Sequence, residues 1–265
     1  MEKAATDIYS FRELRENGFT YVDKTAMILP LCDMSIGKQF FMARPRRFGK
    51  SLLVSTLHCL FEGRRELFQG LAIEPKWDWS KSWPVIHLDM GDCQADSVDG
   101  LWGKIRDSLI SESERLGVAL RTDASVPGLF KFLLQDVAAK AKDGQVVLLV
   151  DEYDKPLLGH LSKPDVTQFR DALKEFYSVI KTLEEKQRFT FLTGVSKFSK
   201  VSIFSDSQQL EGSHDDGIGG DAARVYARRA EEVFPGVPEA HRRRERADAG
   251  RGVGQGHQVV RRLSV

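Results

Sequence analysis

The chain has 265 residues, a length that suits one large domain or two small ones. Its formal net charge is +1, so no overall field favours a nucleic acid or a membrane surface as partner. Cys32, Cys59 and Cys93 are scattered without the spacing of metal ligands, which indicates reduced thiols. The first residues lack the apolar core of a signal peptide, and no apolar run has the length of a membrane span. We therefore expect a cytoplasmic protein with no membrane partner.

Residues 1–36 predict an N-terminal helical and extended segment that packs on a core. Ser10 and Glu13 have the spacing of a capping box, and Gly18 is a suitable end for the short helix that they open. Residues 19–25 predict a small extended element. The apolar residues 26–33 then predict a second helix.

The next segment has the order of a phosphate-binding loop. Residues 39–43 predict a strand, Gly49-Lys50-Ser51 matches the end of the Walker A motif, and a helix is predicted from there to about Phe61. Loop N–H groups and a helix N-terminus bind anions, Lys50 would reach the β- and γ-phosphates, and Ser51 would bind Mg²⁺. Arg44 stands where the motif has its first glycine, and an arginine does not easily adopt glycine's backbone angles.

Strands and helices alternate through the rest of the core. Residues 84–90 and 188–194 predict strands, and helix faces are spaced along residues 101–109, 129–137 and 169–183. This alternation predicts a parallel sheet covered on both faces. The fold class is therefore α/β, a three-layer P-loop NTPase sandwich with four recognisable core strands.

An acidic pair ends the most apolar of the predicted strands. Residues 146–150 are all apolar and suit a buried parallel strand, which Asp151 and Glu152 follow. As a Walker B pair, Asp151 would hold the shell of Mg²⁺, and Glu152 would orient or deprotonate the attacking water. The alternative is a strand that ends in a solvated acidic turn.

A polar cluster follows the predicted strand 188–194. In P-loop ATPases with a catalytic glutamate, the strand between the two Walker strands carries a sensor group beside the γ-phosphate. By the order of elements, Thr193 or Ser196 would bind the γ-phosphate or the attacking water. Ordinary capping at a strand–helix turn is the alternative.

At residues 44–51, Arg-Pro-Arg-Arg-Phe-Gly-Lys-Ser, the chain resembles the AAA-ATPase-like family of bacterial proteins. Segments 19–25, 84–89, 151–156 and 192–200 agree with the family in order and spacing. The arginine-bearing Walker A loop is the family's own pattern, so Arg44 fits it. The resemblance implies ATP and Mg²⁺ as cofactors, with Lys50 and Ser51 as phosphate and metal ligands and Asp151 and Glu152 as the Walker B pair.

The nucleotide contacts that we expect in the loop are consecutive: Arg46, Arg47, Phe48, Gly49, Lys50, Ser51 and Leu52. For the two arginines the alternative to phosphate contact is a structural position under the loop. Asp154 would orient Lys155 or cap the following helix. Tyr21 and Val22 would line an adenine pocket or pack in the core.

The composition changes after about residue 206, where the resemblance stops. Residues 1–200 contain 17 Lys and 12 Arg, whereas residues 201–265 contain 10 Arg and no Lys, so the two parts differ in character. We expect a P-loop core over residues 37–206 and an Arg/Gly-rich tail over 207–265 that is disordered or translated out of frame. The core would then lack its fifth strand, leaving the Walker A strand at a sheet edge, unless residues 201–204 or 258–260 supply one.

These observations lead to three hypotheses. The first is an ATPase whose Mg²⁺-dependent hydrolysis drives a conformational change in an attached module, with an unknown protein partner. The second is a nucleotide-gated module or truncated relic that does not hydrolyse ATP. The third, nucleic-acid binding through Arg242–Arg246, is weakened because 9 acidic residues nearly cancel the tail's 10 arginines. Full-length members of the family often carry a C-terminal nuclease domain. If the tail does not bind nucleic acid, we expect nucleic acid as a partner only through that domain, which is missing here.

Overall fold

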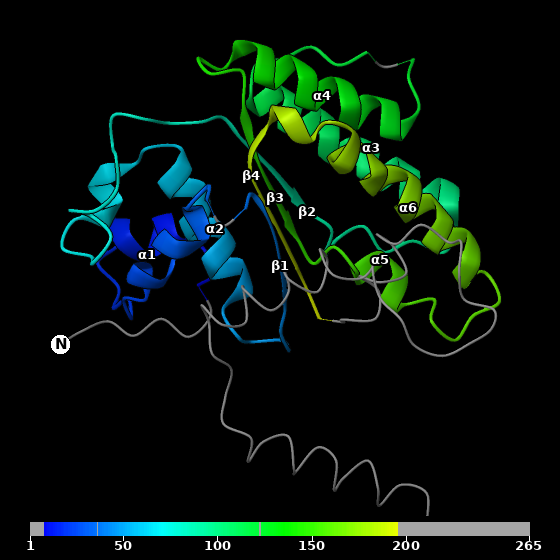
Figure 1. Cartoon of the computed structure of the whole chain (residues 1–265). Helices are drawn as coiled ribbons and strands as arrows, with labels where there is room; N and C mark the ends of the chain where they lie inside the picture. Colours follow the sequence, from blue (N-terminus) through cyan, green and yellow to red (C-terminus); the bar gives the residue numbers. More distant parts are fainter. Residues whose placement is uncertain (1–7, 36, 122, 196–265) are drawn as a thin grey trace, which may run out of the picture. The chain divides into compact units, whose positions relative to one another are not determined.

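The computed structural model describes residues 8–35, 37–121 and 123–195, all within one unit of the chain, residues 1–233. Four strands form its sheet: β1 (Gln39–Ala43), β2 (Val85–Asp89), β3 (Val146–Asp151) and β4 (Gln187–Gly194). Their order is β1-β4-β3-β2, and every neighbouring pair is parallel (Figure 1). The predicted strands are thus confirmed, and all four carboxyl ends lie at the same edge of the sheet.

Six α-helices and four 3₁₀ helices accompany the sheet in the described residues. The α-helices are α1 (Phe11–Glu16), α2 (Lys50–Phe61), α3 (Val98–Arg115), α4 (Val126–Lys140), α5 (Lys155–Leu158) and α6 (Val166–Thr182). The 3₁₀ helices are η1 (Thr25–Met27), η2 (Leu29–Cys32), η3 (Arg65–Phe68) and η4 (Glu184–Lys186).

Helices cover both faces of the sheet, which makes three layers (Figure 1). On one face α2 packs through aromatic contacts, and the rings of Phe61 and Phe189 are 4.9 Å apart. On the other face α3, α4 and α6 share one apolar core with β2 and β3, in which Phe130 stacks on Phe176 at 4.7 Å. Strand β3 is buried along its whole length, as its continuous apolar run predicts. The predicted α/β sandwich of the P-loop type is therefore confirmed.

The second predicted helix, residues 26–33, is wrong as a single α-helix. The structure has η1 and η2 there instead, with i→i+3 bonds from Ile28 N to Thr25 O and from Leu31 N to Ile28 O. Pro30 lies in the first turn of η2, and its ring and missing N–H prevent an α-helix from running through this position. The N-terminal helix agrees with the prediction, because the Ser10 hydroxyl caps α1 by accepting from Glu13 N.

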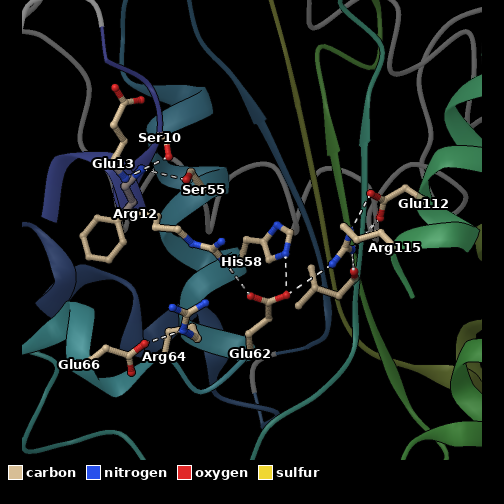
Figure 2. A network of polar contacts seen from close by, with 12 residues as sticks. Ser10, Arg12, Glu13, Ser55, His58, Glu62, Arg64, Glu66, Glu112 and Arg115 are labelled. Atoms are coloured by element: carbon tan, nitrogen blue, oxygen red, sulfur yellow. Dashed lines mark hydrogen bonds and ion pairs between the residues drawn. The ribbon is translucent and has the colours of Figure 1, made fainter. Parts of the chain in front are cut away.

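A group of charged side chains joins α1, the end of α2 and α3 (Figure 2). Glu62 follows α2, and its carboxylate lies 3.1 Å from His58 Nε2, 3.5 Å from Arg115 Nη1 and 3.6 Å from Arg12 Nη2. The His58 contact and the two arginines lower the pKa of Glu62 below its usual value. Ser55 on α2 also accepts a hydrogen bond from Phe11 N at 2.9 Å. Helix α2 is thus bonded to its neighbours at Ser55 and just beyond its carboxyl end.

Among the described residues β1 forms one end of the sheet, paired with β4. The two segments proposed as a fifth strand, residues 201–204 and 258–260, lie outside the described residues. The domain boundary at 206 and the character of the tail therefore stay predictions. In the part of the chain that the structure describes, no helix combines the length and the apolar character that a membrane crossing needs.

A small residue is required where β4 ends. A Cβ on Gly194 would lie 2.5 Å from Tyr153 Cε1 and 2.7 Å from Asp154 Oδ1. We expect Gly194→Ala to lower the free energy of unfolding by about 1–3 kcal/mol, because the buried neighbours must move. Urea unfolding measures this loss.

Gly103→Ala is the matched control. Gly103 is exposed on α3, and a Cβ there meets nothing within 4 Å. Alanine should leave stability unchanged or raise it by about 0.5–1 kcal/mol, since it lowers the entropy of the unfolded chain. A Gly194→Ala protein as stable as wild type would contradict the packing described here.

Candidate functional site

The loop in which the sequence predicts a Walker A motif connects β1 to α2 at the carboxyl edge of the sheet. Arg44 continues the strand pairing, because its N–H donates to Gly194 O at 3.1 Å. Left-handed backbone occurs later in the loop, at Arg47 (φ 66°) and Gly49 (φ 73°). The unusual backbone conformation that the motif suggested for Arg44 is therefore found at Arg47. A non-glycine residue in this left-handed conformation is strained by about 1–2 kcal/mol.

Lys50 lies inside this loop. It is 6% exposed, and its ammonium donates to the carbonyl oxygens of Arg44 at 3.1 Å and Pro45 at 3.2 Å. An ammonium has three N–H donors, so one is left for a further acceptor beyond these two carbonyls. The charge is held where the loop N–H groups and the start of α2 also favour an anion.

The remaining predicted loop contacts differ in exposure. Arg46, Arg47 and Phe48 are exposed, so neither arginine lies under the loop as a structural charge. Ser51 and Leu52 are half-buried in the first turn of α2. The loop thus presents two cations and an aromatic ring on its outer side.

Asp151 and Thr193 are brought together by the pairing of β3 with β4. Asp151 is 3% exposed and Thr193 is fully buried. The Thr193 hydroxyl donates to Asp151 Oδ1, which also accepts from Glu152 N at 2.9 Å. The sensor candidate on β4 therefore contacts the carboxylate that we expect in the Mg²⁺ shell. Ser196, the other sensor candidate, lies outside the described residues.

The Glu152 carboxylate lies towards β2. Its backbone is left-handed, with φ 49°, and its Oε2 accepts a hydrogen bond from Lys155 Nζ at 3.0 Å, which makes an ion pair. The same oxygen would be 3.6 Å from a Cβ placed on Gly91, which follows β2. Burial raises the pKa of Asp89 at the end of β2 above its usual value, and the negative charges of Asp151 and Glu152 raise it further.

Asp154 has a role that the sequence did not reveal. It occupies the N-cap position of α5, but its side chain makes no capping bond there. Its two carboxylate oxygens lie 3.2 and 3.0 Å from Val195 N, the first residue after β4. Tyr153 N donates in turn to Thr193 O at 2.9 Å. The segment after β3 is thus fastened to the end of β4.

For Tyr21 and Val22 the sequence left two alternatives open, an adenine pocket or packing in the core, and the structure shows how each residue lies. The Tyr21 ring packs edge-on against Phe11 at 5.1 Å, and burial raises the pKa of Tyr21 above its usual value. Val22 is 73% exposed. Tyr21 therefore packs against the N-terminal helix, and Val22 has no comparable burial.

The residues at this edge fit a magnesium nucleotide. Mg²⁺ prefers oxygen ligands and is held in such sites by a hydroxyl and a carboxylate of the protein together with the phosphates of the nucleotide. Ser51 has such a hydroxyl, and Asp151 has such a carboxylate. Across residues 8–35, 37–121 and 123–195, no group of three or more His, Cys, Asp or Glu side chains is arranged to hold a metal ion.

A parallel α/β sandwich with a phosphate loop after β1 and an acidic pair after β3 is a P-loop NTPase-like fold. The family described as "Predicted AAA-ATPase" matches residues 5–204. The chain belongs to this AAA-ATPase-like family.

A relative from Azotobacter chroococcum mcd 1 is described as "Uncharacterized protein in vnfD 5'region". It is 41% identical over 212 residues, which cover 79% of this chain and 40% of the relative. The chain thus matches less than half the length of that relative. No solved structure matches the chain.

The hydroxyl of Thr193 supports a buried charge and can be tested by removing it. We expect Thr193→Val to lower the free energy of unfolding by about 1–3 kcal/mol, because the Asp151 carboxylate loses a donor that water cannot replace. Urea unfolding at neutral pH measures the loss. Thr193→Ser keeps the hydroxyl and should lose about 0.8 kcal/mol for the missing methyl group. A valine variant at least as stable as the serine variant would contradict this role.

Proposed function

We propose that the chain binds ATP with Mg²⁺ and hydrolyses it, and that hydrolysis changes the conformation of an attached module. The observation that carries the proposal is the strand order β1-β4-β3-β2. Residues 44–51 follow β1 and Asp151 and Glu152 lie where β3 ends, and Thr193 is on the strand between β1 and β3, an arrangement that supports a Walker A loop and a Walker B pair. Family membership supports nucleotide binding, and the site geometry supports the division of roles.

Each residue has a role that its surroundings allow. The Lys50 ammonium, with one donor beyond the loop carbonyls, would bind the β- and γ-phosphates. Ser51 and Asp151 would supply oxygen ligands to Mg²⁺. Thr193 would hold the Asp151 carboxylate in orientation through its hydroxyl. Glu152 would act as the general base on the attacking water.

The outer side of the loop would contact the rest of the nucleotide. Arg46 and Arg47 are exposed beside the phosphate loop, where a guanidinium can bind phosphate oxygens in a bidentate manner. Phe48 is 50% exposed, which leaves part of its ring open to a flat apolar group. Gly49 and Leu52 would contribute backbone N–H groups. A cytoplasmic location and an unknown protein partner remain predictions of the sequence.

Two substitutions separate binding from chemistry. Lys50→Ala should weaken MgATP binding by roughly tenfold or more, since a charge-assisted bond to phosphate is lost. Glu152→Gln should retain binding and lower kcat by about 100-fold or more, the range of a general base. Isothermal titration calorimetry and phosphate release measure the two quantities.

Lys131→Ala is the control, because Lys131 is exposed on α4, on the opposite face of the sheet from α2. It should leave both quantities unchanged. Chelation of Mg²⁺ by EDTA should weaken nucleotide binding in the wild type. A wild-type chain that binds neither ATP nor ADP in the presence of Mg²⁺ would remove the proposal.

A second function is favoured by the Glu152–Lys155 ion pair. A general base held by a cation is less available to a water molecule, so the chain could bind nucleotide as a gated interaction module without turning it over. Measurable ATP affinity together with hydrolysis at the background rate would identify this function.

A further inference from the structure

At the carboxyl edge of the sheet, the end of β3 has different neighbours in its two directions. β3 has β4 on one side and β2 on the other, and the Walker A loop lies beyond β4, after β1. Neighbouring strands are about 4.8 Å apart, so β1 and β2 are separated by roughly 14 Å. A side chain after β3 can therefore point towards the phosphate loop or away from it.

The Glu152 carboxylate lies near the residues that follow β2. Its Oε2 is 3.6 Å from the Cβ that a residue at Gly91 would carry, and Gly91 follows β2. The left-handed backbone at Glu152 sets the direction in which the side chain leaves the strand. Asp151, one residue earlier, accepts instead from Thr193 on β4. Asp151 thus contacts β4, whereas the Glu152 carboxylate lies near the segment that follows β2.

A cation holds Glu152 in this position. Lys155 is the first residue of α5, and its Nζ lies 3.0 Å from the same Oε2 that approaches Gly91. The side chains of Lys155 and Glu152 are 19% and 25% exposed, so water screens the pair less than it would screen a surface pair. Figure 1 shows α5 and α2 on opposite sides of the strands. The ion pair therefore holds the carboxylate beside the first residue of α5.

Like charges make a holding cation necessary. Asp89 and Asp151 end the neighbouring strands in direct register, and Glu152 follows them at the same edge. Carboxylates this close repel one another, and their charges add to the effect of burial, which is the main cause of the raised pKa of Asp89. Without Lys155, repulsion by the neighbouring carboxylates would favour movement of the Glu152 side chain away from the β2 side.

We propose that Lys155 is a positioning residue that holds the Glu152 carboxylate on the β2 side of the edge and so limits hydrolysis. The inference rests on the proposed function, because it assigns a control to the general base of that reaction. Hydrolysis requires Glu152 to leave Lys155 and turn towards the water beside the γ-phosphate. The observed rate is then reduced by the fraction of time for which the pair is closed.

The experiment compares steady-state hydrolysis by the full chain and its Lys155→Met variant. Methionine keeps much of the length of the side chain and removes the charge, so Glu152 is released. An ion pair of this kind corresponds to roughly a fivefold change in an equilibrium, and kcat should rise by about that factor. KM and the dissociation constant of MgADP should stay within about twofold of wild type, because Lys155 does not bind phosphate in this mechanism.

Two further variants separate positioning from a general effect on the fold. Lys155→Arg keeps a cation and should retain the wild-type kcat. Lys163→Met removes an exposed lysine beyond α5 and should change neither kcat nor KM. If circular dichroism shows that Lys155→Met does not fold, Lys155→Gln replaces it under the same criteria.

The outcomes distinguish this inference from the proposed function. A kcat for folded Lys155→Met that is equal to or below the wild-type value overturns the positioning role. The positioning role is also overturned if the wild type and Lys155→Met both bind MgATP and neither hydrolyses it. That result would leave nucleotide binding intact. A wild-type chain that binds no nucleotide removes the proposed function and the inference with it.

Discussion

The parallel pairing of β4 between β1 and β3 is the constraint on which the rest of the site depends. Because all four strands run in the same direction, each sends its carboxyl end to one edge, about 4.8 Å from its neighbour. Two motifs about a hundred residues apart in the chain thereby lie one strand apart in space. β4 is thus both a spacer and a source of contacts for each motif. Its pairing fixes how far the phosphate loop lies from the acidic pair.

The end of β4 binds to both of its neighbours through ordinary hydrogen bonds. Gly194 O accepts from Arg44 N at the start of the phosphate loop, and Val195 N donates to Asp154 after β3. Between them, Thr193 donates to Asp151. Strain is concentrated on the same edge, where Arg47 and Glu152 have left-handed backbone without being glycine. Such strain persists where the surroundings determine the local conformation, and it is typical of functional loops.

The sequence predicted the framework because each strand is a short apolar run with a clear boundary, and because the strands alternate with periodic helices. It was wrong at residues 26–33, where apolar composition suggested an α-helix and Pro30 prevents one. It placed residues 44–51 and the acidic pair Asp151–Glu152 at the carboxyl ends of their strands, as the structure has them. Such features are local, so composition and periodicity suffice to find them.

The contacts that side chains make were harder to predict from the sequence than the strands and helices. The bond from Val195 to Asp154 joins residues 41 positions apart and depends on the register of β3 against β4. The pair of Glu152 with Lys155 spans three positions, a spacing that would have suggested contact on a regular helix. Here α5 begins at Lys155, so the contact depends instead on the backbone angle of Glu152. Neither the register of β3 against β4 nor the backbone angle of Glu152 can be predicted from residue types alone.

Arg44 shows why a departure from a motif need not damage it. A glycine at the first position of a phosphate loop is useful when the chain must turn there at once. In this protein the chain stays extended for one more residue, held by Gly194 O, and turns at Arg47 and Gly49. The arginine side chain is therefore tolerated at residue 44, and the Arg44 carbonyl oxygen accepts from Lys50. The loop keeps the placement of its ammonium because β4 supplies the contact that delays the turn.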